Sequence, residues 1–220
     1  MKDALIKLGC NPSKIVYTPC APNDLFFNLQ PSYSKNQFIS IGRFVDKKAP
    51  YFSILAFQIV LKKYPKYILK MAGDGPLLNT CKNLVGHLGI QNNVIFIGVI
   101  SPEELKNEFI LSKGFIQHSI TADNGDKEGT PVAVMEASAA GIPVISTYHA
   151  GIPDVIIHDQ TGLLSEEKNI EDMAQNIIKI IENPDLAVAM GNRGRHRIKD
   201  NFNMRIHIRT IQKALEPEVS

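Results

Sequence analysis

The chain has little cysteine, no long apolar run and no concentration of charge of one sign. Its three cysteines, Cys10, Cys20 and Cys81, are odd in number and irregularly spaced, which argues against a disulfide framework or a zinc site. No apolar run approaches the roughly 18 residues of a membrane span, and "MKDALIKLGCNPSKIVYTP" has no apolar centre of a signal peptide. These absences favour a protein of the reducing cytoplasm.

The charges nearly balance, with 24 Lys and Arg against 22 Asp and Glu and a formal net charge of +2. They are spread along the chain, so no concentrated basic segment marks a nucleic-acid-binding protein or strong lipid binding. Any basic site must therefore be local. With 44% hydrophobic and 21% charged residues, the 220-residue chain has the composition of a globular protein of one large or two small domains.

Short β-branched segments alternate with segments whose apolar residues recur at helical spacing. The predicted strands are residues 14–18, 37–42, 67–73, 93–98, 113–119, 142–147 and 161–165, and the predicted helices between them are 49–64, 76–89, 101–112 and 130–141. This alternation predicts an α/β fold, a Rossmann-like parallel sheet with helices on both faces. The strands are continuously apolar, as burial on both faces requires. After Ser165 the pattern is helical only, which predicts a helical C-terminal tail.

Three parts are expected along the chain. Residues 1–36, with one short helix, one strand and a loop, are interpreted as a connector. Residues 37–200 form the Rossmann-like domain, and residues 201–220 form a last helix and a frayed end, "EPEVS".

Two helix starts carry clear punctuation. Ser101 precedes Pro102 with Glu104 three residues on, and Thr130 precedes Pro131. Ser or Thr is expected to cap each helix, with Pro at the first helical position.

In an open parallel sheet, ligands bind beyond the carboxyl ends of the strands, so residues just after strands are the candidates. The first such segment is "IGRFVDKKAP". Gly42 ends a strand, and Arg43 and Lys48 lie on the following turn, where two cations could clamp a diphosphate. A solvated basic turn is the alternative, and Lys47 competes with Lys48 for the role.

The second segment is "AGDGPLL", which contains Asp74. Gly73 and Gly75 follow a strand and Pro76 is expected to open a helix, whose first backbone amides could face an anion or sugar hydroxyls. An ordinary turn is the alternative, because Gly, Asp and Pro are common in turns.

The third segment is "DKEGTPVAVMEASAAGIPV". Free amides around residues 129–133 would form an anion-binding helix N-terminus, with Gly129 allowing close approach of a ligand. Glu136 falls in an otherwise apolar helix. A buried carboxylate without donors is costly, and the two adjacent hydroxyls of a ribose could supply them. The alternative is that Glu136 faces solvent or pairs with a distant Arg.

Two possible metal sites are discounted. The segment "TADNGDKEG" collects carboxylates but lacks the ligand spacing of an EF-hand loop, so an acidic surface loop is the better interpretation. The six histidines form no helical metal pair.

Taken together, these segments resemble the C-terminal, donor-binding half of retaining GT-B glycosyltransferases, in particular family four. The resemblance runs from about Phe38 to Leu215. Its most specific element is the pair of glutamates in "EGTPVAVME", Glu128 and Glu136, together with "GRFVDKK", "MAGDGPL", "NVIFIGVISPEEL", "GIPVISTYHAGIPDVI" and "TGLL" in the family's order. Ala49 departs from the family's usual Gly after the Lys, and Ile152 and Asp154 stand where a second Gly and a Glu are common.

The resemblance implies roles for individual residues. Arg43 and Lys48 would hold the donor diphosphate, Glu136 would bind the ribose, and the main chain near Ile100 would touch the base. Glu128 would face the donor sugar or its phosphate, together with amides of the turn that follows it. The glycine turns would also contribute to donor binding. The donor-binding set implied is Gly42, Gly73, Asp74, Ile100, Gly129, Thr130, Pro131, Val132 and Glu136, and the catalytic set is Glu128, Arg43 and Lys48.

The activity implied is transfer of a sugar from a nucleoside diphosphate to a saccharide or lipid-linked saccharide acceptor, with retention and without a metal or other cofactor. Exopolysaccharide or cell-surface glycan synthesis is the closest subset. The full enzyme would be cytoplasmic, with a peripheral place at the inner membrane face as an alternative. The acceptor-binding N-terminal half is expected to be missing, so the chain alone should transfer little. A non-catalytic nucleotide-sugar-binding subunit and a GT-B epimerase or phosphorylase remain alternatives.

Overall fold

The computed structural model describes residues 2–18 and 20–215. Its centre is one six-stranded sheet in the order β3-β2-β1-β4-β5-β6. All neighbouring strands pair in parallel. The strands are β1 Gln37–Ile41, β2 Ile68–Ala72, β3 Val94–Gly98, β4 Phe115–Ile116, β5 Val144–Thr147 and β6 Gly162–Ser165. The predicted Rossmann-like parallel sheet is therefore confirmed.

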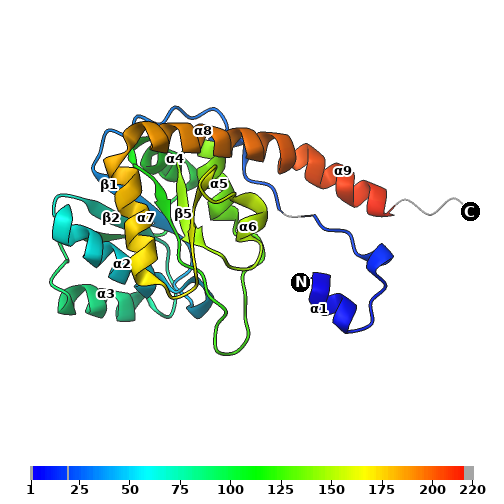
Figure 1. The fold of residues 1–220 in the computed structure, drawn as a ribbon, viewed down its shortest axis with the longest axis horizontal. Coiled ribbons are helices and arrows are strands. Elements are labelled where there is room, and N and C mark those ends of the chain that lie inside the picture. The colour runs from blue at the N-terminus through cyan, green and yellow to red at the C-terminus, as the bar shows by residue number, and fades with distance from the viewer. Residues whose placement is uncertain (1, 19, 216–220) are drawn as a thin grey trace, which may run out of the picture.

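Helices cover both faces of this sheet (Figure 1). The longer ones are α2 Pro50–Lys63, α3 Leu78–His87, α4 Pro102–Leu111, α5 Val132–Ala140, α7 Ile170–Glu182, α8 Pro184–Asn201 and α9 Met204–Leu215. Two short helices are α1 Lys2–Lys7 and α6 Ile152–Val155, and 3₁₀ turns span Pro12–Lys14, Asp24–Phe26 and Asp46–Lys48. The helical tail after β6 is as predicted.

Two apolar clusters hold these layers together, one on each face of the sheet. Neighbouring residues of β1 show the division, because successive side chains of a strand point to opposite faces. Phe38 packs in the cluster under α2, α3 and α7, whereas Ile39 packs in the cluster under α4, α5 and α8. Both side chains are fully buried. Because each face of the sheet is covered, its strands are the continuous apolar runs seen in the sequence.

The start of α4 forms as predicted. The backbone N–H of Glu104 donates to Ser101 Oγ, and the Ser101 N–H donates to Glu104 Oε2 at 2.7 Å, with Pro102 at the first helical position. This reciprocal capping satisfies two donors that the helix itself cannot.

Two other predicted helix starts are wrong. Pro131 has extended backbone angles, so α5 begins at Val132, and no side-chain cap bond forms there. Thr130 therefore does not cap the helix. Similarly, α3 begins at Leu78 and Pro76 lies in the preceding turn, because that turn is held by backbone bonds to the β1–α2 segment.

The predicted strand at 14–18 is also wrong. Lys14 ends a 3₁₀ turn, and residues 15–18 pair with no strand of the described chain. Their side chains instead contact α6 and α9: Tyr17 Oη donates to Asp154 Oδ2 at 2.9 Å, and Thr18 Oγ1 lies 2.9 Å from His207 Nδ1. A β-strand forms only where a neighbouring strand offers backbone N–H and C=O groups for pairing. The β-branched residues of this segment have no such neighbour in the described part of the chain.

The two ends of the described chain lie away from the sheet (Figure 1). Helix α9 has no buried residue, and α1 lies apart from the domain body. The segment before β1 nevertheless joins the core through Phe26, whose ring centroid lies 5.5 Å from that of Phe109. Residues 216–220, expected to fray, lie outside the described residues. Across residues 2–18 and 20–215, a helix with the length and apolar character of a membrane span does not occur.

Candidate functional site

The carboxyl ends of the strands open onto a groove of about 390 Å³, which we call the strand-end groove. Its walls come from the last residues of β1 and β2, from the segments that follow β1, β2 and β3, and from the start of α4. It is lined by Ile41, Gly42, Arg43, Ala72, Gly73, Asp74, Gly75, Val99, Ile100 and Leu105. The volume lies in the range of small-molecule sites, about 300–1,000 Å³. The position is the one at which open parallel sheets bind ligands.

Glycines let the two loops of this groove pack backbone against backbone. A Cβ on Gly73, whose φ is +127°, would lie 2.0 Å from the Gly42 carbonyl oxygen. A Cβ on Gly75 would lie 2.6 Å from the Phe44 carbonyl oxygen. Backbone bonds join the same loops, with Phe44 N–H donating to Asp74 O at 2.9 Å. The two glycines of the "GDG" turn are therefore needed for this close backbone packing, and the turn also forms part of the groove wall.

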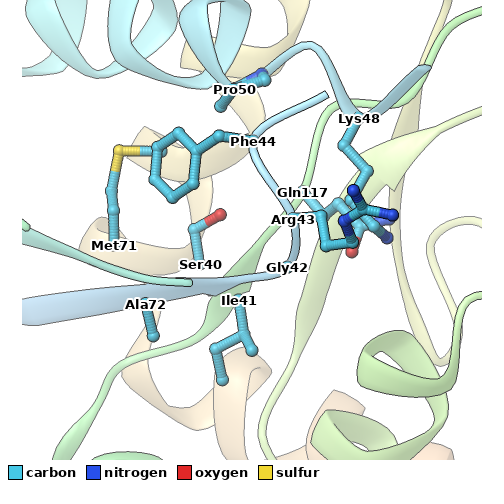
Figure 2. A pocket seen from close by; sticks show the side chains of 10 residues that line it. All are labelled: Ser40, Ile41, Gly42, Arg43, Phe44, Lys48, Pro50, Met71, Ala72 and Gln117. Atoms are coloured by element: carbon cyan, nitrogen blue, oxygen red, sulfur yellow. The ribbon is translucent and has the colours of Figure 1, made fainter. Parts of the chain in front are cut away.

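Arg43 and Lys48 lie on the same side of the β1–α2 turn. Figure 2 shows their side chains near Gln117, with Phe44 and Met71 on the other side, and all five residues line a small cavity of about 20 Å³. The turn itself is tight, since Asp46–Lys48 form a 3₁₀ turn and Ala49 adopts a left-handed conformation with φ +35°. That conformation explains why Gly is common at the position of Ala49 in the resembled family.

The neighbouring lysines have different partners. Lys48 Nζ lies 3.2 Å from Glu128 Oε1, and both side chains are largely buried. Lys47 instead pairs with exposed Asp126 at 3.3 Å. Of the two lysines, Lys48 is therefore the one that faces the turn before α5, and the acidic loop 121–129 is bound to the β1–α2 turn through both pairs.

The turn from Glu128 to Val132 lies between the β1–α2 and β5–α6 connections. Gly151 N–H donates to Gly129 O at 3.0 Å, and a Cβ on Gly151 would lie 2.6 Å from Thr130 Oγ1. Helix α5 starts at Val132, one residue later than expected, so the helix N-terminus with its unpaired amides lies there. The anion-binding role of these amides stays a prediction.

Glu136 lies half-buried on α5, and desolvation raises the pKa of its carboxyl to about 7. In the described part of the chain no hydrogen bond or ion pair contributes to that shift. Among the described residues no arginine forms an ion pair with Glu136, and its side chain is neither fully buried nor fully exposed. It is a candidate acceptor for donors of a ligand, because a buried carboxylate needs them.

The structure brings some of the predicted residues together and leaves others apart. Gly42, Arg43, Gly73, Asp74 and Ile100 all line the strand-end groove. Lys48 lies beside Gly42 and connects this group to Glu128. Glu136 and residues 129–132 are not in the groove wall as lined by the described residues.

Sequence reasoning missed several polar residues at the same edge of the sheet, after β4, β5 and β6. Gln117, His118 and His149 are buried, and Glu167 is partly exposed. Desolvation lowers the pKa of His118 to about 4, so its ring is neutral. Gln117 Oε1 is buried without a hydrogen-bond partner in residues 2–18 and 20–215. The signal available in the sequence was their position within two residues of the end of a strand.

Comparison with known proteins places the chain in a family. Residues 23–197 match the family model described as glycosyl transferases group 1. Over 215 residues the chain is 30% identical to the amylovoran biosynthesis glycosyltransferase AmsK of Erwinia amylovora, covering 96% of this chain and 53% of AmsK. It is 28% identical over 217 residues to the putative colanic acid biosynthesis glycosyltransferase WcaL of Escherichia coli, again 96% of this chain and 53% of the relative. The chain thus spans about half the length of these curated relatives.

Solved structures agree on the fold. The crystal structure of HepE from Anabaena, in complex with UDP and glucose, superposes with a TM-score of 0.81, covering 96% of this chain and 60% of HepE. The two sequences are 17% identical. At this identity the match supports the Rossmann-like architecture of one GT-B half.

Proposed function

This chain belongs to the glycosyl transferases group 1 family, and we propose that it binds a nucleoside diphosphate sugar as the donor half of a retaining glycosyltransferase. The observation that carries the proposal is the ion pair between Lys48 and Glu128, next to a groove at the carboxyl ends of the strands whose wall includes Arg43. Two cations at a groove of this size suit a diphosphate. Glu128, already next to Lys48, would meet the sugar attached to that diphosphate.

Each candidate residue takes one part of the donor. Arg43 and Lys48 hold the diphosphate, the backbone of Gly42, Gly73 and Asp74 forms the wall beneath it, and the main chain at Ile100 meets the base. The first amides of α5, in the turn Gly129–Thr130–Pro131–Val132, face the phosphate or the sugar. Glu136 accepts hydrogen bonds from the ribose diol, which gives its otherwise unpaired carboxyl two donors.

The chemistry is departure of the nucleoside diphosphate as an acceptor hydroxyl attacks the anomeric carbon. Negative charge grows on the departing diphosphate, and preorganised cations and amides stabilise it without reorganisation. We assign that task to Arg43, Lys48 and the α5 N-terminus. Attack on the face of departure, with Glu128 beside the sugar, is the route we favour from the resemblance. No metal is assigned a role, so donor binding is expected to persist in EDTA.

We propose that the acceptor-binding site lies in a domain that this chain does not include. AmsK and WcaL are about twice as long as the matched segment and are named for the biosynthesis of amylovoran and colanic acid. We therefore propose a saccharide or lipid-linked saccharide acceptor, exopolysaccharide synthesis, and a second domain that binds the acceptor. The isolated chain is expected to bind donor and to transfer little sugar.

Isothermal titration calorimetry with UDP-glucose, GDP-mannose and ADP-glucose tests donor binding. Binding of at least one is expected, and Arg43→Ala should weaken it about tenfold or more, since a charge-assisted contact to phosphate is lost. Arg193→Ala is the matched control, because Arg193 contacts Gln160 O before β6, at the other end of the strands. A folded protein with no affinity for any of the three donors would refute the proposal.

A further inference from the structure

A buried histidine and a carboxylate join the two ends of the loop that carries Glu128. Glu128 N–H donates to His149 Nε2 at 3.1 Å, at the end of the loop. His149 Nδ1 lies 2.6 Å from Glu167 Oε1, and Thr121 N–H donates to Glu167 Oε2 at 2.9 Å, at the start of the loop. One continuous chain of hydrogen bonds thus runs from Thr121 to Glu128.

The backbone amide of Glu128 fixes the tautomer of His149. A backbone N–H can only donate, so Nε2 must be the unprotonated nitrogen that accepts. The neutral ring then carries its proton on Nδ1 and donates it to Glu167. Burial raises and the bonds from His149 and Thr121 lower the pKa of Glu167, and the net shift is downward, which keeps this carboxylate ionised.

His149 is held by its neighbours at the end of β5. It is 1% exposed and lies two residues after β5, where Tyr148 N–H donates to Ser165 O and Ile152 N–H donates to His149 O. Glu167 lies two residues after β6. The pair therefore ties the loop to the ends of two strands of the sheet.

We infer that His149, held in one tautomer by Glu167, is the positioning residue that places Glu128 and the α5 N-terminus for the donor. This inference rests on the proposed function for its consequence in donor binding. The mechanism is specific: an acceptor at the place of His149 Nε2 holds the Glu128 amide, and the Glu128 side chain then meets Lys48 at 3.2 Å. Without that acceptor the buried N–H is left without a partner and the turn moves.

Two substitutions distinguish the effect of the hydrogen-bond acceptor of His149 from the effect of the size of its ring. His149→Phe keeps a ring and removes the acceptor, whereas His149→Gln can place its amide oxygen near the position of Nε2. We expect His149→Phe to weaken binding of UDP-glucose or GDP-mannose about tenfold, a loss of about 1.4 kcal/mol, and His149→Gln to restore it to within about threefold. Unfolding in urea shows whether each variant is folded.

His158→Phe is the matched control. His158 Nδ1 also accepts a backbone N–H, that of Leu164 at 2.9 Å, but Leu164 lies within β6 and not in the loop that carries Glu128. Its substitution should lower stability comparably and leave donor affinity within about twofold, since this bond does not hold Glu128. An equal loss of donor affinity in His158→Phe would overturn the inference, as would wild-type affinity in His149→Phe or failure of His149→Gln to restore binding.

Amide hydrogen exchange and histidine ¹⁵N spectra test the positioning role of His149 in the absence of any nucleotide sugar. The spectrum of the wild-type chain should show His149 protonated at Nδ1 and unprotonated at Nε2. Exchange of the Glu128 amide should accelerate in His149→Phe and stay slow in His149→Gln. The opposite tautomer, or unchanged Glu128 exchange in His149→Phe, would overturn the positioning role. If the wild type binds no donor but these spectra are as expected, the proposed function fails and the inferred loop anchor stands.

Discussion

Lys48 and Glu128 form a largely buried ion pair, with 3.2 Å between Lys48 Nζ and Glu128 Oε1. The two residues come from segments far apart in sequence, Lys48 from the turn after β1 and Glu128 from the turn before α5. Under the proposed function, a diphosphate that binds Lys48 would compete with Glu128 for this side chain. The pair would then limit donor affinity in addition to stabilising the fold.

Glu128→Gln is expected to raise the affinity for free UDP about three- to tenfold, because the substitution removes a carboxylate that repels the diphosphate and occupies Lys48. Lys48→Ala should lower it about tenfold and destabilise the fold by about 1–3 kcal/mol, since the buried Glu128 loses its partner. Calorimetry and urea unfolding measure the two effects. Lys47→Ala is the control, with a change in stability of about 1 kcal/mol or less expected from its exposed pair. If it weakens UDP binding as much as Lys48→Ala, the assignment of Lys48 is wrong.

Glu136→Gln should stabilise the protein at pH 8 and have little effect near pH 4.5. Burial raises the pKa of the Glu136 carboxyl to about 7. The folded state therefore holds the proton more tightly than the unfolded chain, and the cost of ionising the carboxyl grows as pH rises from the ordinary carboxyl pKa through about 7. The gain at pH 8 is expected at about 1–2 kcal/mol, a value that allows for partial exposure.

Urea unfolding at pH 5 and pH 8 checks this gain. Exposed Glu103 supplies the control, because Glu103→Gln removes a carboxyl that solvent already surrounds. A pH-independent effect of Glu136→Gln would contradict the burial assigned to this carboxyl. The same variant should also bind donor more weakly above pH 7, since the ribose diol would lose an ionised acceptor.

Gly73→Ala should distort the strand-end groove. Its Cβ would lie 2.0 Å from the Gly42 carbonyl oxygen, so the turn carrying Arg43 must move. We expect a loss of about 1–3 kcal/mol in stability together with at least tenfold weaker donor binding. Gly98→Ala is the comparison: its φ of +70° is also unfavourable, but nothing lies within 4 Å of the added Cβ. That variant should lose about 1–2 kcal/mol and keep its donor affinity.

Gly191→Ala should destabilise the packing of α8 on α5 by about 1–3 kcal/mol. The added Cβ would lie 2.0 Å from the Gly141 carbonyl oxygen, which is backbone and cannot rotate away. Gly86→Ala offers the opposite case in a helix, since nothing lies within 4 Å of its Cβ and α3 gains about 0.5–1 kcal/mol from the change. Urea unfolding of both variants should show shifts of opposite sign. A stabilised Gly191→Ala would mean that α8 does not pack this closely.

Much of the fold could be predicted because local patterns carried it. The strand segments 37–42, 67–73, 93–98, 142–147 and 161–165 are apolar enough to be recognised as buried on both faces, and the cap at Ser101 lies within four residues of chain. The strand at 14–18 failed because the same β-branched composition is compatible with an extended segment that has no ladder partner. A sequence pattern indicates that a segment can be extended, whereas strand pairing depends on whether another strand lies beside that segment in the folded protein.

For the candidate site, too, some residues could be predicted from the sequence and others could not. Arg43, Gly73 and Ile100 follow strands, and the parallel topology alone brings the ends of those strands to one edge. The hydrogen bonds of His149 could not be predicted, because its partners Glu128 and Glu167 lie in other segments of the chain. No sequence pattern indicates which group each ring nitrogen contacts. The choice of Lys48 over Lys47 as the partner of Glu128 likewise depended on the direction of each side chain from a 3₁₀ turn.

The sequence by itself determined the α/β class, the parallel sheet and the family resemblance, because hydrophobic period, turn residues and motif order are local properties of the chain. Only the tertiary structure decided that α5 begins at Val132, that Lys48 meets Glu128, and that Glu167 and His149 hold the loop between Thr121 and Glu128. Those contacts join segments distant in sequence, and their energies depend on burial and direction, which exist only once the chain has folded.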